Sequence, residues 1–331
     1  MKIVTIVGAR PQFIKAAPVS KAIRDHNEKK KGPRITEVLV HTGQHYDHGM
    51  SQIFFDELDI SEPDLNLGVG SGTHGWQTGQ MLVRIEEVLL EEKPDFVVVY
   101  GDTNSTLAGA LAAVKLHIPV AHVEAGLRSF NRKMPEEHNR VVADHCADLL
   151  FCPTQTAVDN LAREGVTNGV YLVGDTMYDA VLQFSSIARK RSTILEELGL
   201  ESKTYLLTTI HRPYHTDIPE NLRNIFQAFA EIGEIIVFPA HPRTSKKIAA
   251  LESSFSQGLA PGNIKIIEPV GYLDMLVLEE NARLILTDSG GMQKEAYFFG
   301  VPCITLRTET EWVETGWNVV AGADISAIVE G

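Results

Sequence analysis

The sequence predicts an α/β protein built from two doubly wound domains, and three observations support this prediction. Short apolar segments alternate with longer segments of helical periodicity, which is typical of a parallel sheet covered by helices on both faces. The alternation is interrupted near Gly174 and then restarts. The length of 331 residues is too great for one ordinary core and sufficient for two. We therefore expect domains over residues 1–173 and 174–331.

The first domain is predicted from apolar strands separated by helices. The strongest strand is 95–102, because three valines in succession favour a buried, extended chain. The helix 106–115 is rich in alanine, the best helix former. In chain order the expected elements are strand 2–8, helix 14–24, strand 37–43, a segment 54–60 ending in a turn near Pro63, helix 78–90, strand 95–102, helix 106–115, strand 118–126, strand 148–154 and a helix ending at Glu164.

The second domain begins with a long helical segment, predicted over 177–198. Apolar runs of strand length then return at regular intervals. The strands expected here are 204–210, 234–240, 264–270, 283–288 and 301–306.

Composition excludes several classes of partner. The net charge of -13 argues against a nucleic-acid or anionic-membrane surface. No apolar run approaches membrane-spanning length, and the N-terminal run is too short for a signal peptide. Cys146, Cys152 and Cys303 lack metal-type spacing and are expected to be buried, reduced thiols. We expect a cytoplasmic protein that binds neither nucleic acid nor membrane.

Polar residues follow most of the predicted strands. Ligands of open α/β sheets bind beyond the carboxyl ends of the strands, so these segments predict one cleft between two facing sheets. The segments are 8–11, 41–45, 101–104, 122–126, 211–212, 241–243 and 288–291.

The segment TDSGG at 287–291 lies between a predicted strand and a predicted helix. Gly290 and Gly291 allow backbone N–H groups to approach a ligand at a helix N-terminus, which favours anions. Ser289 either caps this helix or donates to a phosphate. One turn later, Glu295 is either a ribose ligand or a solvated carboxylate.

Arg10 and Lys15 follow the first strand. Two cations beside this turn suit a diphosphate, although both could be surface charges. The segment lacks the glycine-rich dinucleotide signature and the P-loop lysine motif, so neither site type is supported.

Asp102, Glu124 and Glu136 lie at or just after predicted strand ends. A carboxylate that an apolar strand delivers to a cleft is suited to proton transfer. Asp102 could instead cap the following helix, and Glu136 could be part of an acidic first helical turn after Pro135. His211 ends a strand of the second domain, where a histidine by itself is more often structural.

Together these motifs resemble the non-hydrolysing UDP-N-acetylglucosamine 2-epimerases. The resemblance implies the glycosyltransferase-B architecture, in which two Rossmann-like domains face a central cleft that holds the nucleotide sugar. The matching segments span nearly the whole chain in order: GARPQFIKAAP (8–18), HTGQHYD (41–47), GDTNSTLAGALAA (101–113), HVEAGLRS (122–129), PEEHNR (135–140), His211-Arg212, AHPRT (240–244) and LTDSGGMQKEA (286–296).

The resemblance also implies a mechanism. A base removes the C2 proton of the sugar, UDP leaves from C1 to give a bound glycal, and UDP adds back after C2 is reprotonated on the opposite face. Proton transfer falls to Asp102, Glu124 and Glu136, with base and acid unassigned, while His211 stabilises the departing diphosphate. The first domain forms the sugar and acid–base side and the second binds UDP. No cofactor or metal is implied, and a homodimer is expected.

The family pattern also assigns ligand-binding residues. Arg10, Lys15, Ser289 and Gly290 would hold phosphates, and Glu295 would bind the ribose. The remaining residues assigned to the UDP-sugar site are Arg212, His241, Tyr272, Gly291 and Arg307.

Three segments depart from the family pattern. Pro213-Tyr214-His215 replaces Arg-Glu-Asn after the His-Arg step, Trp312 replaces an arginine within 310–314, and the loop 73–80 differs. These segments flank the expected sugar pocket and the region where some relatives bind a second, activating UDP-sugar. The printed sequence ends at Gly331, before the family's C-terminal helix that crosses back to the first domain.

These departures keep a second substrate open, UDP-2,3-diacetamido-glucuronate. Trp312 could pack against an added acetamido methyl group, and Arg132, Arg243 and Arg307 could pair with a uronate. A hydrolysing epimerase, a glycosyltransferase and a non-catalytic UDP-sugar binder are further alternatives. Retention of all three carboxylates argues against the binder.

Overall fold

The computed structural model describes residues 1–30, 32–44, 62–240, 242–252, 262–310 and 318–331. The chain divides into two compact units, Met1–Ala180 (unit 1) and Val181–Gly331 (unit 2). The division falls within helix α7 (Thr176–Arg191), just after the boundary expected at residue 174.

Unit 1 contains a seven-stranded sheet in which all pairs are parallel. The strand order is β3-β2-β1-β4-β5-β6-β7. The strands are β1 (Lys2–Val7), β2 (Thr36–His41), β3 (Leu65–Asn66), β4 (Phe96–Tyr100), β5 (Val120–Val123), β6 (Leu149–Cys152) and β7 (Val170–Leu172).

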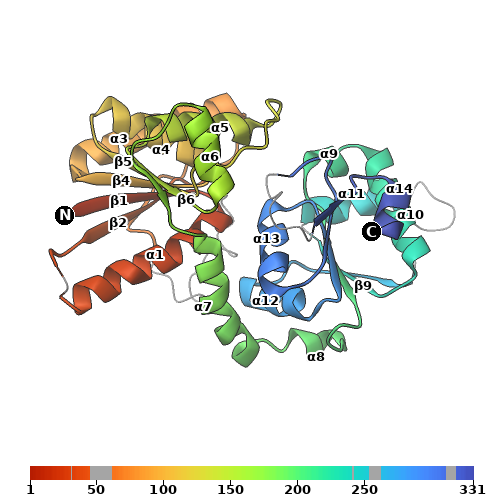
Figure 1. Cartoon of the computed structure of the whole chain (residues 1–331). Helices are drawn as coiled ribbons and strands as arrows, with labels where there is room; N and C mark the ends of the chain where they lie inside the picture. The colour runs from red at the N-terminus through yellow and green to blue at the C-terminus, as the bar shows by residue number, and fades with distance from the viewer. Residues whose placement is uncertain (31, 45–61, 241, 253–261, 311–317) are drawn as a thin grey trace. The chain divides into compact units, whose positions relative to one another are not determined.

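Helices cover both faces of this sheet, as Figure 1 shows, with α1 on one side and α3, α4 and α5 on the other. The core between the sheet and the second group includes Val4, Ile6, Met81 and Ile85, all buried. The helices are α1 (Arg10–Glu28), α3 (His74–Glu92), α4 (Asn104–Lys115), α5 (Pro135–Cys146) and α6 (Gln155–Arg163).

Unit 2 repeats this plan with a six-stranded parallel sheet in the order β10-β9-β8-β11-β12-β13. Its strands are β8 (Leu206–Thr209), β9 (Ile236–Pro239), β10 (Ile264–Ile267), β11 (Leu284–Thr287), β12 (Cys303–Thr305) and β13 (Asn318–Val320). Besides the part of α7 from Val181 onwards, its helices are α8 (Ile194–Leu198), α9 (Pro213–Thr216), α10 (Pro219–Ile232), α11 (Pro242–Glu252), α12 (Tyr272–Asn281), α13 (Gly290–Phe299) and α14 (Ile325–Glu330). Buried aromatic residues of α10 and β9 fill part of its core.

Each unit therefore has the Rossmann-like arrangement, in which the strand order reverses beside the first strand. The reversal lies between β1 and β4 in unit 1 and between β8 and β11 in unit 2. Such a switch point leaves a crevice at the carboxyl ends of its two strands, where ligands bind. The predicted α/β class with two doubly wound sheets is confirmed.

Several predicted details were wrong. The segment 177–198 forms two helices rather than one. The chain turns at Ser192, whose hydroxyl donates to Asp274 at 2.6 Å and accepts from the Ile194 N–H at 3.3 Å. The short strands β3, β7 and β13 were not predicted. Cys146 is half-buried rather than buried, although all three cysteines are free thiols.

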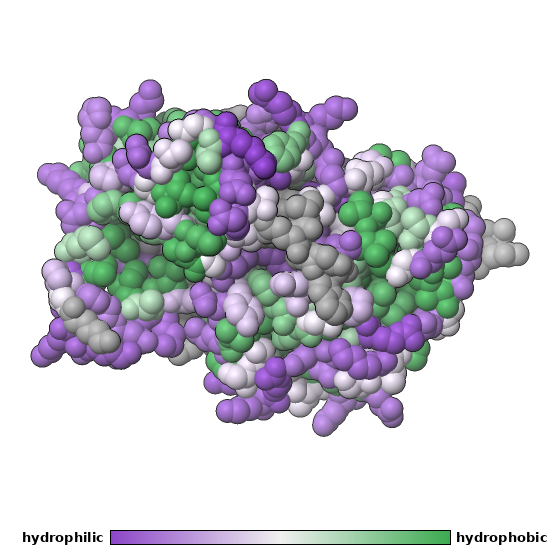
Figure 2. Space-filling view, in the orientation of Figure 1, coloured by the Kyte–Doolittle hydropathy of each residue, from purple (hydrophilic) through white to green (hydrophobic). Residues whose placement is uncertain are grey.

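Helix α3 exposes a row of apolar residues. Trp76, Val83 and Leu90 are each at least half exposed and lie seven residues apart, so they share one face of the helix. Figure 2 shows other hydrophobic residues among hydrophilic ones on the visible surface of unit 1. No helix in the described ranges is long and apolar enough to cross a membrane.

The first strand–helix turn depends on a glycine. A Cβ at Gly8 would lie 1.9 Å from the Ser105 hydroxyl and 2.3 Å from the Thr42 hydroxyl, which are themselves hydrogen-bonded at 2.8 Å. We expect Gly8→Ala to lower the free energy of unfolding by about 1–3 kcal/mol, because the added methyl overpacks this contact. Urea unfolding of the whole protein would measure the change.

Gly79 offers the matched control, because a Cβ there meets no atom within 4 Å and the residue lies inside α3. Gly79→Ala is expected to raise the free energy of unfolding by about 0.5–1 kcal/mol through helix propensity. Equal changes in the free energy of unfolding for Gly8→Ala and Gly79→Ala would contradict the close packing at Gly8.

Candidate functional site

The switch point of unit 1 is cross-linked by Gln12 on α1. Its side-chain oxygen accepts hydrogen bonds from the N–H groups of Gly8 (2.7 Å) and Ala9 (3.1 Å). Its amide nitrogen donates to the Tyr100 carbonyl at 2.7 Å and to the Thr106 hydroxyl at 3.0 Å. Gln12 therefore fixes the end of β1 against the end of β4. Sequence reasoning missed it, although it stands beside Arg10 in the quoted motif.

Lys15 and Glu124 form an ion pair at this switch point, with Nζ and Oε2 2.7 Å apart and both side chains almost buried. A Cβ at Gly101 would lie 3.4 Å from Lys15 Nζ and 3.8 Å from Glu124 Oε1, so this backbone passes directly beside the pair. Lys15 is therefore not a surface charge. Glu124 has φ of +70°, which is uncommon outside glycine and marks a constrained position.

Asp102 does not cap helix α4. The cap is Thr103, whose hydroxyl accepts from the Thr106 N–H at 3.3 Å. The Asp102 carboxylate instead pairs with Arg140 of α5, and Asn139 donates to the Asp102 carbonyl at 2.9 Å. The capping alternative is thus excluded for Asp102, which remains about one-third exposed at the end of β4.

The two glutamates at the start of α5 have different surroundings. Glu137 is buried and accepts hydrogen bonds from the Ser129 N–H (2.9 Å), the Ser129 hydroxyl (2.8 Å) and the Phe130 N–H (2.9 Å). It also pairs with Arg140 at 3.1 Å. Glu136 is half-buried in the first helical turn after Pro135. Glu137 thus holds the preceding loop, while Glu136 stays partly accessible.

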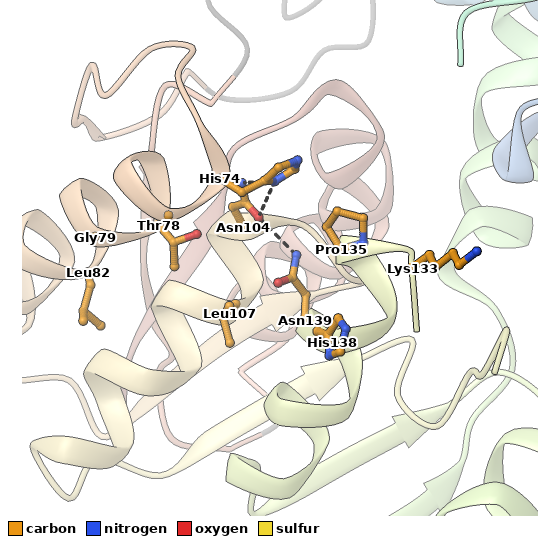
Figure 3. A pocket seen from close by; sticks show the side chains of 11 residues that line it. His74, Thr78, Gly79, Leu82, Asn104, Leu107, Lys133, Pro135, His138 and Asn139 are labelled. Carbon is orange, nitrogen blue, oxygen red and sulfur yellow. Dashed lines mark hydrogen bonds between the residues drawn. The ribbon is translucent and has the colours of Figure 1, made fainter. Parts of the chain in front are cut away.

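A pocket of about 500 Å³ opens between the starts of α3, α4 and α5 (Figure 3). On its wall Asn104 contacts both the His74 ring (3.1 Å) and the Asn139 amide (3.2 Å), as the dashed lines in Figure 3 show. Because Asn139 also binds the Asp102 carbonyl, the pocket wall is joined to the switch point.

The switch point of unit 2 is organised by Asp288, a fully buried residue of the TDSGG segment. Its carboxylate lies 2.7 Å from His211 Nδ1 and accepts from the N–H groups of His211 (3.0 Å) and Arg212 (2.9 Å). Burial by itself raises the pKa of Asp288, but the charge and hydrogen bonds of His211 and the backbone N–H groups outweigh it and lower the pKa. Asp288 was not among the predicted site residues.

His211 is consequently oriented by a carboxylate while its ring remains half exposed. An aspartate at Nδ1 fixes the ring orientation and leaves Nε2 available to a ligand. Arg212 lies beside it, and its Nε donates to the Asp288 carbonyl at 3.2 Å.

Ser289 caps helix α13, since its hydroxyl accepts from the Met292 N–H at 3.4 Å. The helix begins at Gly290 and Gly291, so the expected N-terminus with small residues is present beside His211. The partial positive charge of a helix N-terminus favours an anion at this place.

Glu295 is buried on α13 and is not a solvated carboxylate. The Tyr272 hydroxyl of α12 donates to Glu295 Oε1 at 2.9 Å. Close by, both carboxyl oxygens of Glu279 are buried without a hydrogen-bond partner in the described part of the chain. Burial, and secondarily the charge of Glu295, raises the pKa of Glu279 well above its ordinary value.

The other expected residues are placed as follows. Arg10 begins α1 and is half-buried, and Arg307 is buried just after β12. His241 and Trp312 lie outside the described residues, as does the side chain of Arg243. Within the described ranges, no group of three or more His, Cys, Asp or Glu side chains could hold a metal ion.

Two Rossmann-like sheets in one chain, each with charged residues at its switch point, place the protein in the glycosyltransferase-B fold class. A sequence model of UDP-N-acetylglucosamine 2-epimerase matches residues 27–331. The chain therefore belongs to the UDP-N-acetylglucosamine 2-epimerase family.

Individual relatives agree with this assignment. The chain is 58% identical to a Methanococcus maripaludis protein named UDP-N-acetylglucosamine 2-epimerase homolog, over all of this chain and 91% of that protein. It is 51% identical, with the same coverage, to the UDP-2,3-diacetamido-2,3-dideoxy-D-glucuronate 2-epimerase of Pseudomonas aeruginosa. The crystal structure of Methanocaldococcus jannaschii UDP-GlcNAc 2-epimerase with UDP-GlcNAc and UDP matches with a TM-score of 0.90 and 48% identity, over all of this chain and 91% of that one.

The buried Glu279 leads to a prediction about stability and pH. A carboxyl whose folded pKa is raised keeps its proton in the folded state, whereas the unfolded chain loses it above about pH 4.5. Stability therefore falls as pH rises from that value towards the folded pKa, by up to about 1.4 kcal/mol per pH unit. We expect Glu279→Gln to remove this slope.

Melting temperatures at pH 5 and pH 8 would measure this pH dependence. The melting temperature of Glu279→Gln minus that of the wild type should be larger at pH 8 than at pH 5. Glu231→Gln, at an exposed position of α10, is the control and should give the same difference from the wild type at both pH values. A difference in melting temperature between Glu279→Gln and the wild type that does not change with pH would contradict the proposal that Glu279 keeps its proton in the folded protein.

Proposed function

We propose that this protein is a non-hydrolysing UDP-sugar 2-epimerase that interconverts UDP-N-acetylglucosamine and UDP-N-acetylmannosamine. The observation that carries the proposal is the pair of carboxylates on adjacent strands of unit 1. Asp102 follows β4 and Glu124 follows β5, strands that pair in register from Val97–Val120 to Tyr100–Val123. Family membership and the related crystal structure with UDP-GlcNAc and UDP support the same activity.

The proposed reaction proceeds by elimination and re-addition. A carboxylate of unit 1 takes the C2 proton, the C1–O bond breaks, and UDP departs with the bonding electrons to leave a 2-acetamidoglycal. A proton is then returned to the opposite face of C2, and UDP adds back to C1. Asp102, Glu124 and Glu136 are the groups proposed for the proton transfers.

The charged residues divide the remaining tasks. In unit 1, Arg10 and Lys15 would face the diphosphate. Before substrate binds, Lys15 is paired with the Glu124 carboxylate. In unit 2, His211 would stabilise the departing diphosphate, with Arg212, Ser289, Gly290 and Gly291 around it. Glu295 would bind the ribose, with Tyr272 orienting its carboxylate. We assign His241 and Arg307 to the same UDP site.

One relative supports a second candidate substrate. The Pseudomonas aeruginosa enzyme that shares 51% of its residues with this chain acts, by its name, on UDP-2,3-diacetamido-2,3-dideoxy-D-glucuronate. The Methanococcus maripaludis homolog shares more, 58%, which favours UDP-N-acetylglucosamine.

We further propose that the protein is a cytoplasmic homodimer. The exposed row of Trp76, Val83 and Leu90 on α3 supports self-association, because a two-fold axis would pair this row with its own copy. The three free thiols support a reducing compartment. Sedimentation equilibrium that returns the monomer mass at micromolar protein would reject the dimer.

Incubation with UDP-GlcNAc in deuterated water tests the activity. We expect deuterium at C2, with the nucleotide sugar intact and UDP-N-acetylmannosamine present. Release of the free sugar would instead identify a hydrolysing epimerase. If neither C2 exchange nor sugar release is observed, the protein would be a glycosyltransferase or a UDP-sugar binder.

Asp102→Asn and Glu124→Gln should slow turnover by roughly 10²–10⁴-fold, the range of a lost acid–base group. UDP affinity, measured by calorimetry, should change little, because neither carboxylate is among the residues proposed to contact UDP. Near-normal turnover in both variants would remove these residues from the proposed mechanism.

Ser289→Ala and Glu295→Ala should behave in the opposite way and weaken UDP affinity. A lost hydrogen bond to a charged group costs about 1.5–3 kcal/mol, which is roughly one to two decades in Kd. Glu231→Ala, on the exposed side of α10, provides a control that should bind UDP as the wild type does. Unchanged affinity in both site variants would leave Ser289 as a helix cap alone.

Specificity constants for the two sugars decide the substrate. We expect kcat/KM for UDP-GlcNAc to equal or exceed that for the diacetamido uronate. The reverse order would establish the uronate as the preferred substrate while retaining the epimerase reaction.

A further inference from the structure

His122, on β5, is a fully buried histidine that the proposed chemistry does not use. Its Nε2 lies 2.7 Å from the Gly101 carbonyl and its Nδ1 lies 2.7 Å from Asp144 Oδ1. A carbonyl oxygen only accepts, so Nε2 must carry a hydrogen. The ring thus spans from helix α5, which carries Asp144, to the last turn before Asp102.

Asp144 is anchored from several directions. Arg128 Nη1 donates to its Oδ2 at 2.7 Å, and the Gly126 N–H donates to the same oxygen at 3.1 Å. The other edge of the Arg128 guanidinium makes two bonds of 2.7 Å to Glu164. Burial raises the pKa of Asp144, but His122 and Arg128 outweigh this and lower it, so Asp144 is ionised.

This cluster holds the backbone on both sides of Glu124. Asp144 binds His122, two residues before Glu124, and the N–H of Gly126, two residues after it. The intervening backbone is constrained, with φ of +70° at Glu124 and +81° at Gly126. A Cβ at Gly126 would lie 2.4 Å from the Ala157 carbonyl, so this chain path requires glycine.

The same ring fixes the chain beside Asp102. Gly101, which accepts from His122, also has a left-handed backbone with φ of +61°. Gly101 lies against the Lys15–Glu124 pair, so a shift of its peptide would move Asp102 relative to Glu124.

We propose that His122 is a positioning residue for the proton transfers: held by Asp144, it pins the Gly101 carbonyl and so sets the separation of the Asp102 and Glu124 carboxylates. The inference rests on the proposed epimerase function and assigns a role to a residue outside the reacting groups.

Two substitutions of His122 separate its two contacts. The asparagine amide nitrogen is as far from Cβ as Nδ1, and the glutamine nitrogen is one bond further, like Nε2. His122→Asn keeps a donor towards Asp144 and loses the Gly101 contact, whereas His122→Gln keeps a donor towards Gly101. We expect His122→Asn to lower kcat by roughly 100-fold, as for a displacement of about 1 Å, and His122→Gln to retain at least roughly a tenth of wild-type kcat.

The Kd for UDP should stay within about twofold of the wild type in both variants, because the damage falls on proton transfer rather than on binding. His145→Asn, at the partly exposed neighbour of Asp144 on α5, is the matched control and should be fully active. A kcat of His122→Asn within about twofold of the wild type, or equal kcat values for the asparagine and glutamine variants, would overturn the proposal.

Thermal unfolding checks that each variant folds. If His122→Asn does not, Asp144→Asn replaces it and should lower kcat by a similar factor with UDP binding retained. Absence of C2 deuteration in the wild type rejects the epimerase function itself. Wild-type deuteration with an unaffected His122→Asn rejects only the positioning role.

Nitrogen-15 spectra of histidine-labelled protein give a readout that does not depend on activity. The ring signals absent from His122→Gln should show a hydrogen on Nε2 in the wild type, because Nε2 donates to the Gly101 carbonyl. A wild-type ring without a hydrogen on Nε2 would overturn the proposal, whatever the turnover.

Discussion

A buried aspartate paired with a histidine holds the strand ends of each unit. Asp144 binds the His122 ring and the Gly126 N–H, and Asp288 binds the His211 ring and the N–H groups that follow β8. An ionised carboxylate in a protein interior is tolerated only where charges and donors surround it, and loss of one partner leaves an uncompensated charge. Each aspartate therefore restricts its loop to the one path that supplies those partners.

The two pairs place their histidines differently. His122 is fully buried and has a protein acceptor for each ring nitrogen, whereas half of the His211 side chain is exposed. The first arrangement suits a residue that holds backbone in place, and the second suits a residue that meets a ligand. The left-handed backbone at Glu124 adds to the first arrangement, because such a conformation persists only where the surrounding contacts impose it.

Sequence patterns predicted the two sheets and the strand ends that carry polar residues, because apolar runs and turn residues are local signals. They did not predict side-chain partners. Arg140 reaches Asp102 across 38 residues, and Asp288 reaches His211 across 77, so these pairs depend on how helices and loops pack on the sheet. Asp102 was a reasonable cap for α4, but Thr103 is equally suited, and a one-residue offset cannot be read from composition. The short edge strands β3, β7 and β13 were not predicted, because two or three residues are too few to show a periodic pattern.

The strand order of unit 1 also has a consequence for how the chain folds during synthesis. The central strand β1 pairs with β4, and the Lys2 N–H donates to the Asp95 side chain 93 residues later. The ribosome must therefore release almost a hundred residues before β1 finds its second neighbour, and the first strand emerges with one edge open. Long-range pairing of this kind is slow and leaves strand edges exposed to other chains. The part of unit 1 that carries the proposed acid–base residues is thus completed late, and a nascent chain is most vulnerable to aggregation before β4 appears.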